Sequence, residues 1–407
     1  MNSFRTAGDT RLMNASAPVD DPHFPTRPII FLALASFASL AMIRSIDVLL
    51  PQIASEMNVS IGAAAIVVTA YVLSHGTTQL IVGPIGDRLG KYKSITVACG
   101  LSAIVVAICG LAQTLSTLTA LRLLSGFTAG WIIPLAMAFI GDVVPYERRQ
   151  QALGSFLSGQ IAGAIVGQAA SGILGDMFGW RSVFFALAGL FTIATIGLIY
   201  ELATSPRTRA ADRRPAAPGN PFRDYGRVLS SRLARFILIV VLIESALVFS
   251  VFAFIGADLH LRFGLSFTTV GLVIAAFGIG GIAYAANVRW LVDWLGPRGI
   301  GNAGGVLLGI SFMTLAIQPV WWLAPVAVAG IGAGFYALHN TLQTVGTQMA
   351  PEARGTAVSL FASAFYIGQT AGVAVAAPLV DQIGVPPLYA VSALLLPILA
   401  VVFTRRL

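Results

Sequence analysis

"GPIGDRLGKYKS", residues 83–94, gathers Asp87, Arg88, Lys91 and Lys93 into one short stretch of a chain in which only 10% of residues are charged. On each side of it lie about twenty residues that carry no formal charge. An α-helix needs roughly 20 predominantly apolar residues to cross the hydrocarbon core of a bilayer. We therefore interpret the charged stretch as a short loop that joins two transmembrane helices.

Uncharged runs of this length recur along all 407 residues, 57% of which are hydrophobic, with a mean hydropathy of +0.83. Soluble domains carry roughly 25% charged residues, so the composition indicates an all-α integral membrane protein. We predict twelve transmembrane helices, over residues 29–51, 62–85, 94–113, 117–140, 151–175, 181–200, 233–257, 268–291, 300–317, 321–345, 356–379 and 386–404.

The helices fall into two sets of six, separated by a stretch rich in Pro, Ala and Arg. The predicted organisation is a cytoplasmic tail (1–27), an N-terminal half (28–200), a cytoplasmic linker (201–232) and a C-terminal half (233–407). The two halves repeat each other, because a shift of 206 residues aligns Asp87 with Asp293 and Gly126 with Gly332. The same repeat pairs "EMNVS" (56–60) with "RFGLS" (262–266) and, with one residue fewer, "GDMFG" (175–179) with "VDQIG" (380–384). Duplicated halves are typical of secondary transporters.

The positive charges predict the orientation in the membrane. Of the 25 Lys and Arg residues, 21 lie on one side if both termini share that side, whereas only Arg181 and Arg262 lie in loops on the other. Cytoplasmic loops carry an excess of Lys and Arg, so both termini are expected in the cytoplasm of a bacterium, with the protein in its cytoplasmic membrane. The net charge of +8 follows from this bias, and no nucleic-acid partner is expected.

Three motifs resemble those of major facilitator superfamily transporters, and the resemblance extends from about residue 28 to residue 404. The loop at residues 83–94 fits the family's pattern G-x-x-x-D-x-x-G-R/K. The stretch "LRLLSGFTAG" (121–130) fits the family's pattern for the fourth helix, and "GDVVPYERR" (141–149) fits the pattern at the end of that helix. The resemblance implies alternating access between the two halves, with the first, fourth, seventh and tenth helices around a central cavity.

The same resemblance implies a cytoplasmic gate. Asp87 would face the start of the eleventh helix, near residues 353–355, and Lys91 would pair with Asp142. The implied gate residues are Gly83, Asp87, Gly90, Lys91 and Asp142. The alternative is that Asp87 sits in a solvated turn and only balances the neighbouring cations.

Ionisable side chains inside a span cost about 2.5–3.5 kcal/mol each on insertion scales, so each one calls for an explanation. Arg44 and Asp47 share a face of the first helix, and Arg122 lies at a similar depth in the fourth. If the three meet, Asp47 could take a proton or a cation, while the arginines tune its pKa or hold an anionic group. The alternative is an ion pair that only locks the first and fourth helices together.

Glu244, in the middle of the seventh helix, has no basic residue within a helical turn. It is the second candidate for a proton site, against the alternative of a neutral, hydrogen-bonded structural residue. His339 is a third candidate. It belongs to a polar stripe of Tyr336, His339, Asn340 and Gln343 on the tenth helix, and the second helix carries a similar stripe of Tyr71, His75 and Gln79. We expect both stripes to face the cavity, although a lone histidine in a helix is more often a packing residue.

The predicted function is secondary active transport of small molecules, most closely resembling the proton-coupled exporters of drugs and metabolites. Gly159, Gly163 and Gly167 follow the exporters' fifth-helix spacing, but Ala164 and Gln168 replace its proline and final glycine. An importer or exchanger of organic anions is the alternative favoured by Arg44 and Arg122, and a membrane sensor that transports nothing is a more remote one.

The sequence contains no G-x-x-x-x-G-K-[ST], H-E-x-x-H or G-x-S-x-G motif, so we expect neither an ATP-driven pump nor an enzyme. The two cysteines lie ten residues apart in one apolar run, and no metal-ligand spacing is present. We expect no cofactor and no metal. The expected partners are a small-molecule substrate, protons and the lipid bilayer, and the expected functional unit is a monomer.

Overall fold

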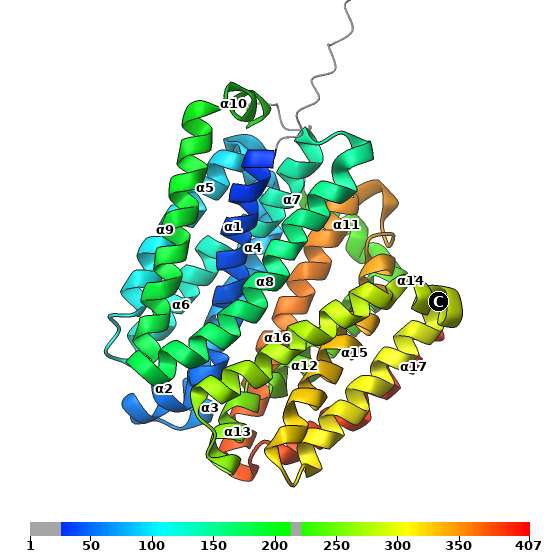
Figure 1. Cartoon of the computed structure of the whole chain (residues 1–407). Helices are drawn as coiled ribbons and strands as arrows, with labels where there is room; N and C mark the ends of the chain where they lie inside the picture. The colour runs from blue at the N-terminus through cyan, green and yellow to red at the C-terminus, as the bar shows by residue number, and fades with distance from the viewer. Residues whose placement is uncertain (1–25, 213–220) are drawn as a thin grey trace, which may run out of the picture.

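The computed structural model describes residues 26–212 and 221–407, and within these ranges it consists of helices and connecting turns without a strand (Figure 1). Nearly all of the predicted tail (1–27) and the middle of the predicted linker lie outside the described residues. The all-helical membrane architecture that the sequence predicts is confirmed.

Six spans form the N-terminal half, and three of them are built from more than one helical piece. The pieces are α1 (Thr26–Arg44), η1 (Asp47–Leu49), α2 (Leu50–Glu56), α3 (Ile61–Ala64), α4 (Ile66–Leu89), α5 (Lys91–Cys109), α6 (Leu115–Ala129), α7 (Ile132–Val143), α8 (Tyr146–Phe178) and α9 (Trp180–Thr204).

The C-terminal half repeats this arrangement. Its pieces are α12 (Arg232–Phe252), α13 (Ile255–Phe263), α14 (Phe267–Ile317), η2 (Trp321–Leu323), α15 (Ala324–Gly346), η3 (Pro351–Ala353), α16 (Arg354–Ile383) and α17 (Pro386–Thr404).

The described chain has eleven helices that are long and apolar enough to cross a membrane, and one of them, α14, is 51 residues long. This helix is two spans joined by a sharp turn at Gly296, where φ is 63° and ψ is 173°. Glycine adopts this left-handed backbone without a steric penalty, and Pro297 then begins the next helix in the position where its missing N–H costs nothing. Counting both parts of α14 gives the twelve spans that the sequence predicts.

Glycine stripes allow the spans to pack backbone to backbone. A Cβ atom added at Gly163 of α8 would overlap the Phe37 carbonyl of α1, and one added at Gly372 of α16 would overlap the Ala246 carbonyl of α12. Small residues permit this close approach in membranes, where the hydrophobic effect does not drive helices together. The two contacts are repeat equivalents, since each joins the fifth span of a half to its first span.

The two halves meet along α8 with α14 and along α3 and α4 with α16. We call the end of the molecule that holds α10 the linker side and the opposite end, with α2, α3 and α13, the far side (Figure 1). Near the far side α8 and α14 lie against each other, because Gly172 packs on the Phe267 carbonyl and Gly278 packs on Ile165. Towards the linker side the same two helices diverge (Figure 1).

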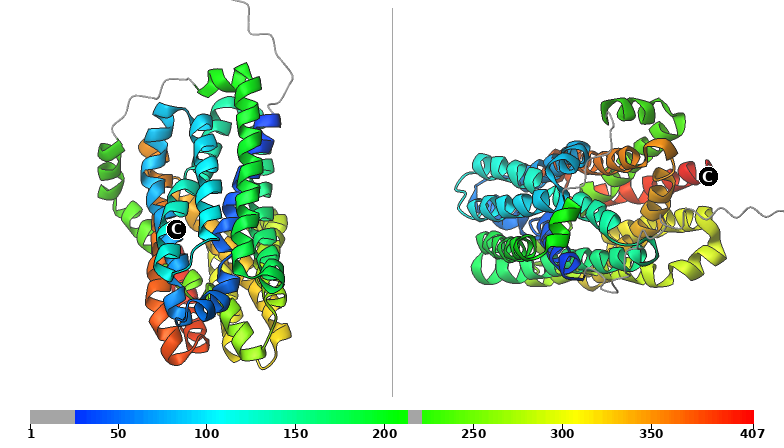
Figure 2. Two further views of the ribbon diagram at one scale, coloured as in Figure 1. Left: turned by 90° about the vertical axis from the view of Figure 1, so that its left-hand side faces the viewer. Right: turned by 90° about the horizontal axis from the view of Figure 1, so that it is seen from above.

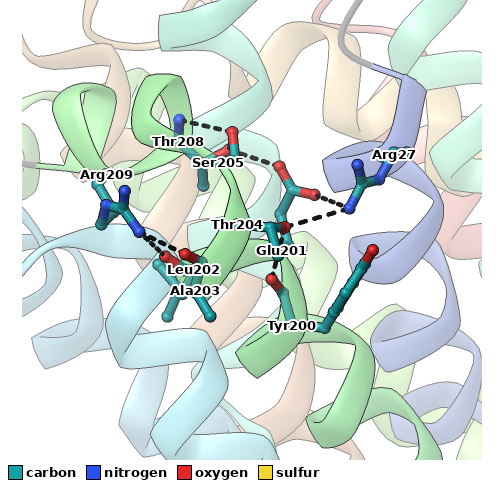
Figure 3. A network of polar contacts seen from close by, with 9 residues as sticks. All are labelled: Arg27, Tyr200, Glu201, Leu202, Ala203, Thr204, Ser205, Thr208 and Arg209. Carbon is teal, nitrogen blue, oxygen red and sulfur yellow. Dashed lines mark hydrogen bonds and ion pairs between the residues drawn. The ribbon is translucent and has the colours of Figure 1, made fainter.

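The linker itself contains two helices, α10 (Pro206–Asp212) and α11 (Pro221–Ser230), which the sequence does not predict. Figure 3 shows how α10 is held against the end of α9. Thr208 donates a hydrogen bond to Oε1 of Glu201 at 2.9 Å, and Arg209 donates to the Leu202 and Ala203 carbonyls at 2.8 and 2.7 Å. The Arg209 bonds satisfy carbonyl groups that the end of α9 would otherwise leave open.

At the end of α10, the carboxylate of Asp212 accepts hydrogen bonds from the Tyr92 and Lys93 backbone N–H groups at 2.6 and 3.2 Å. These groups lie at the start of α5, where unpaired N–H donors attract an anion. Burial raises the pKa of Asp212 above its usual value, although the two hydrogen bonds oppose this shift. Gly90 has a φ of 93°, and a Cβ there would overlap the Asp212 carboxylate. The linker is thus fixed to the loop at residues 83–94, between the second and third spans.

Views from the side and from above give the same arrangement: each half forms a bundle, and α11 lies beside the bundle on the linker side (Figure 2). The Tyr225 hydroxyl of α11 donates a hydrogen bond to the Leu80 carbonyl of α4, while α11 also packs on α12 and α16. The second linker helix therefore contacts both halves.

Candidate functional site

Three spans are interrupted well away from both of their ends, and two of the interruptions coincide with the repeat. The first span breaks between α1 and η1, at residues 45–46, and the seventh breaks between α12 and α13, at residues 253–254. The fourth breaks between α6 and α7, at residues 130–131. Irregular backbone at membrane depth is tolerated only inside protein or beside a water-filled cavity. Discontinuous helices are also where many transporters bind substrate and coupling ions.

Arg44 and Asp47 flank the first break and form a buried ion pair, with Nη1 of Arg44 3.1 Å from Oδ2 of Asp47. The other amino group of Arg44, Nη2, donates a hydrogen bond to Oε1 of Gln369 on α16, in the opposite half. Its guanidinium carbon lies 4.3 Å from the ring centroid of Phe249 on α12. Arg44 is therefore shared between the halves, whereas Oδ1 of Asp47 has no hydrogen-bond partner among the described residues.

Arg122 is fully buried and lies within electrostatic range of Asp47, but no hydrogen bond joins the two in the described structure. Its Nε donates to the Val67 carbonyl at 3.0 Å, and its guanidinium carbon lies 4.2 Å from the ring centroid of Tyr71. Nη1 and Nη2 have no hydrogen-bond partner in the part of the chain that the structure describes. A buried cation usually has a partner, so this group is available to one.

The polar stripe of α4 lies inside the bundle, since Tyr71, His75 and Gln79 are all buried. The ring of His75 stacks on Tyr71 at 5.7 Å and meets Tyr366 of the other half edge-on at 4.8 Å. Nε2 of Gln79 donates to the Gly130 carbonyl, at the break in the fourth span, at 3.4 Å. The stripe thus connects Arg122, the interface between the halves and the broken fourth span.

Glu244 and His339 form a second buried pair, in the C-terminal half, with Nδ1 of His339 2.8 Å from Oε2 of Glu244. Glu244 is fully buried, and its Oε1 has no hydrogen-bond partner among the described residues. The sequence predicts both residues as candidate proton sites but does not indicate that they are in contact. Their contact could have been expected from their positions along the spans. Each residue lies near the middle of a span that the family resemblance places at the cavity.

An aromatic layer, which the sequence does not indicate, separates the two pairs. Phe335 and Phe365 contact the His339 ring, with centroids 4.8 and 4.7 Å away. The same two rings contact Phe249, at 5.2 and 5.6 Å, which in turn lies under Arg44. In the sequence these phenylalanines are indistinguishable from ordinary core residues, because they come from three different spans.

The polar stripe predicted on α15 does not act as one face. His339 turns to Glu244, whereas Tyr336 packs on Gly281 of α14 and Gln343 is exposed. Asn340 interacts with the Tyr284 side chain of α14. The spacing i, i+3, i+4 and i+7 covers a wide arc of a helix, so its members reach different neighbours.

On the linker side, Nζ of Lys91 lies 2.8 Å from Oδ2 of Asp142 and 2.7 Å from Oδ1 of Asp87. The ion pair that the resemblance implied between Lys91 and Asp142 is present. Within the described ranges, no hydrogen bond joins Asp87 to residues 353–355 at the start of α16, and a Cβ at Gly355 would meet open space. Gly83 is equally open, so neither glycine marks a close contact in this conformation.

The formal charges of the four buried residues of the site sum to zero, because Arg44 and Arg122 balance Asp47 and Glu244. Uptake of one proton would leave the site with an uncompensated positive charge in a low-dielectric environment, and a bound ligand could offset it. Among the described residues, no group of three His, Cys, Asp or Glu side chains could hold a metal ion.

Comparisons with known proteins agree with this arrangement. The family model described as Major Facilitator Superfamily matches residues 32–373 and, in a second match, residues 263–407. The chain is 26% identical over 337 residues to the MFS-type transporter YceJ of Bacillus subtilis, covering 81% of this chain and 83% of that one. It is also 26% identical over 384 residues to the chloramphenicol resistance protein of Streptomyces lividans, covering 93% and 96%.

Among solved structures, a point mutant of the nucleoside transporter NupG superposes with a TM-score of 0.76 at 14% sequence identity. The match covers 93% of this chain and 99% of that one. At this level of identity the likeness concerns the fold alone.

Proposed function

The chain belongs to the Major Facilitator Superfamily, and on that premise we propose that it exports small molecules in exchange for protons. It is a multi-pass membrane protein, and its positive charges support a cytoplasmic linker side in a bacterial cytoplasmic membrane. Export is supported by the similarity to a chloramphenicol resistance protein over nearly the whole of both chains. The proposed functional unit is a monomer.

The observation that carries the proposal is the buried pair of Glu244 and His339. A carboxylate and an imidazole in direct contact can take up one proton or two, and each proton changes the net charge of the pair. Because Oε1 of Glu244 has no partner among the described residues, it can accept either a proton or a donor group of a substrate. Proton and substrate would then compete for one atom, which is the simplest basis for exchange.

The aromatic layer provides the apolar part of the proposed binding site. Phe249, Phe335 and Phe365 lie between Glu244 and Arg44, so a bound molecule that parts these rings would contact both buried pairs. Ligand sites are typically apolar, with a small number of polar groups that fix orientation. Movement of the halves would expose this layer first to one side of the membrane and then to the other.

Lys91, Asp87 and Asp142 are the proposed linker-side gate. Asp87 pairs within its own half in this conformation, at 2.7 Å from Lys91. When the linker side closes, the Asp87 carboxylate would instead meet the N-terminal end of α16. Such an interaction is worth about 0.3–1 kcal/mol at an exposed site, small enough to break in every cycle.

The proposal is tested in proteoliposomes with an acidic lumen and a clamped membrane potential. Three labelled probes represent three charge classes: tetraphenylphosphonium, chloramphenicol and benzoate. A difference of one pH unit supplies about 1.4 kcal/mol per proton, which supports about a tenfold accumulation for each proton exchanged. We expect at least tenfold accumulation of the cation or the neutral probe. Accumulation that is the same without a pH gradient would rule out proton coupling.

Asp47→Asn is expected to lower this accumulation by at most about tenfold, the contribution of one proton at one pH unit, because Glu244 still couples the pH gradient to the substrate. The same variant also leaves Arg44 without its carboxylate, which can destabilise the protein by about 3–5 kcal/mol. The double variant Arg44→Gln/Asp47→Asn removes that unpaired charge. We expect the double variant to regain folded protein, measured by size-exclusion chromatography, but not accumulation. Recovery of accumulation would assign the pair a structural role only.

Exchange of organic anions is the second candidate, and one observation favours it. Nη1 and Nη2 of the buried Arg122 have no hydrogen-bond partner in the described structure, and a guanidinium binds a carboxylate with two parallel hydrogen bonds. This candidate predicts that labelled benzoate exchanges for unlabelled benzoate without a pH gradient, and that Arg122→Lys abolishes the exchange because an ammonium cannot bind in the same way.

A further inference from the structure

Two carboxylates on the far side bridge the halves. Asp176, near the end of α8, accepts hydrogen bonds from the backbone N–H groups of Phe267 (to Oδ1, 3.0 Å) and Thr268 (to Oδ2, 2.6 Å), at the start of α14. Asp381, near the end of α16, accepts from the Gly62 N–H (to Oδ1, 2.9 Å) and the Ser60 hydroxyl (to Oδ2, 2.6 Å), at the start of the second span. Each carboxylate belongs to one half and each helix start to the other.

The internal repeat relates these two contacts, which we call the far-side clasps. Asp176 and Asp381 lie in the aligned stretches 175–179 and 380–384, and the two helix starts follow the aligned stretches 56–60 and 262–266. Both starts are capped by serine: Ser60 accepts from the Ala63 N–H at 3.1 Å, and Ser266 accepts from the Thr269 N–H at 3.2 Å. The same kind of contact therefore occurs twice: an aspartate of one half accepts hydrogen bonds from a serine-capped helix start of the other half.

Close backbone packing holds each clasp in place. A Cβ at Gly172, one turn before Asp176, would overlap the Phe267 carbonyl of the opposite half. In the second clasp, a Cβ at Gly62 would overlap the Ala377 carbonyl, one turn before Asp381. The short distance between the backbones lets a side chain as short as aspartate reach the N–H groups across the interface.

The linker side differs in this respect. There Asp87 pairs with Lys91 of its own half, and no hydrogen bond joins it to the start of α16 in the described structure. The carboxylates that cap a helix of the opposite half are thus found on the far side, which is the side that this conformation closes. If the halves alternate, these are the contacts that must break when the far side opens.

We propose that Asp176 and Asp381 form the far-side gate of the transport cycle. A carboxylate at a helix N-terminus gains from the partial positive charge there, and water replaces its hydrogen bonds when the helices part. Each clasp therefore favours the far-side-closed conformation without making it permanent. The proposal rests on the alternation of the two halves in the proposed function. It adds which residues set the ratio of far-side-open to far-side-closed molecules.

Removal of one clasp is expected to raise the ratio of far-side-open to far-side-closed molecules by roughly fivefold, which corresponds to about 1 kcal/mol, the upper end for an exposed carboxylate at a helix N-terminus. The two clasps share no partner residue, so their effects should multiply, to roughly 25-fold for Asp176→Ala/Asp381→Ala. Two equivalent and independent clasps predict that the double variant shifts the ratio by the product of the two single effects.

The measurement is an electron-spin distance distribution across the far side in the purified full-length chain. Spin labels are attached at Leu111→Cys and Ile317→Cys, which lie at exposed far-side ends of opposite halves, with Cys99 and Cys109 replaced by alanine. The double variant should gain a longer-distance population relative to the protein with both clasps. The matched control is Glu56→Gln, because the Glu56 carboxylate binds Trp180 and Arg181 within its own half and should leave the distribution unchanged.

An unchanged distance distribution in Asp176→Ala/Asp381→Ala would overturn the proposal that the two clasps form the far-side gate. Accumulation in proteoliposomes reports separately on the proposed function: a shifted distribution in a protein that accumulates no probe supports the clasps and contradicts proton-coupled export. If the alanine variants do not fold, Asp176→Asn/Asp381→Asn keeps the shape and one acceptor oxygen but removes the charge. It should shift the distribution in the same direction by a smaller factor, and no shift would again overturn the proposal.

Discussion

Glu244→Gln is expected to reduce probe accumulation in proteoliposomes to the equilibrium ratio of one, the largest functional effect of any single substitution. The glutamine keeps the size of the side chain and can still bond to Nδ1 of His339, which lies 2.8 Å from the carboxylate in the native protein. It cannot take up a proton, so the pH gradient can no longer perform work on the substrate. At one pH unit the loss is about tenfold for a single proton and about 100-fold for two.

The control for this variant is downhill movement of the same probe. A site that binds substrate but no proton should still equilibrate labelled probe across the membrane, so Glu244→Gln should remain active in exchange of labelled for unlabelled probe. Retained accumulation would show that Glu244 is a structural residue. Loss of exchange together with loss of folded protein would assign the effect to stability.

Gly163→Leu is expected to abolish the yield of folded protein, the largest structural effect. A Cβ at this position would overlap the backbone of Phe37, so α1 and α8 could not reach their present separation. Backbone atoms cannot move aside as a flexible side chain can, and overpacking a well-packed contact costs about 1–3 kcal/mol even where neighbours adjust. The displaced α1 would carry Arg44 and Asp47 away from the opposite half.

The same helix offers a matched control, since a Cβ at Gly154 of α8 would meet nothing within 4 Å. Gly154→Leu should therefore give a normal yield, and it replaces a weak helix former with a strong one. Yield and monodispersity are measured by fluorescence-detected size-exclusion chromatography. Equal yields of the two variants would contradict the backbone contact between α1 and α8.

Much of the fold could be predicted from the sequence because the bilayer imposes a simple rule on it. Uncharged runs, bounded by charged loops, predicted all twelve spans, and the offset of 206 residues predicted the two halves. The structure adds the breaks beside Arg44 and Asp47 and the helices of the linker. Neither is visible in hydropathy, because a short break leaves a run apolar and α10 and α11 are short and polar.

The site was predicted only in part, for a reason that its residues make clear. Arg44 and Asp47 lie three positions apart in the sequence, so their contact could be expected from local geometry. Glu244 and His339 are 95 residues apart, and Arg44 and Gln369 are 325 apart, so their contacts depend on how the spans pack. Glutamine and phenylalanine inside a span also have many roles, and only their neighbours distinguish a site from a core.

The clasps illustrate the same limit. The stretches that contain Asp176 and Asp381 could be aligned from the sequence alone, yet the alignment did not indicate that each carboxylate caps a helix of the other half. That assignment needs the positions of the Phe267, Thr268 and Gly62 N–H groups.

Proton movement driven by substrate is the most direct test of proton exchange at Glu244. Inside-out membrane vesicles that contain the protein are energised until their lumen is acidic, and a pH-sensitive dye is followed as each of the three probes is added. With the native chain, one class of probe should discharge the gradient, and with Glu244→Gln no class should. Discharge that is equal with both proteins, or transport of a labelled probe that moves no protons with the native chain, would contradict exchange through Glu244.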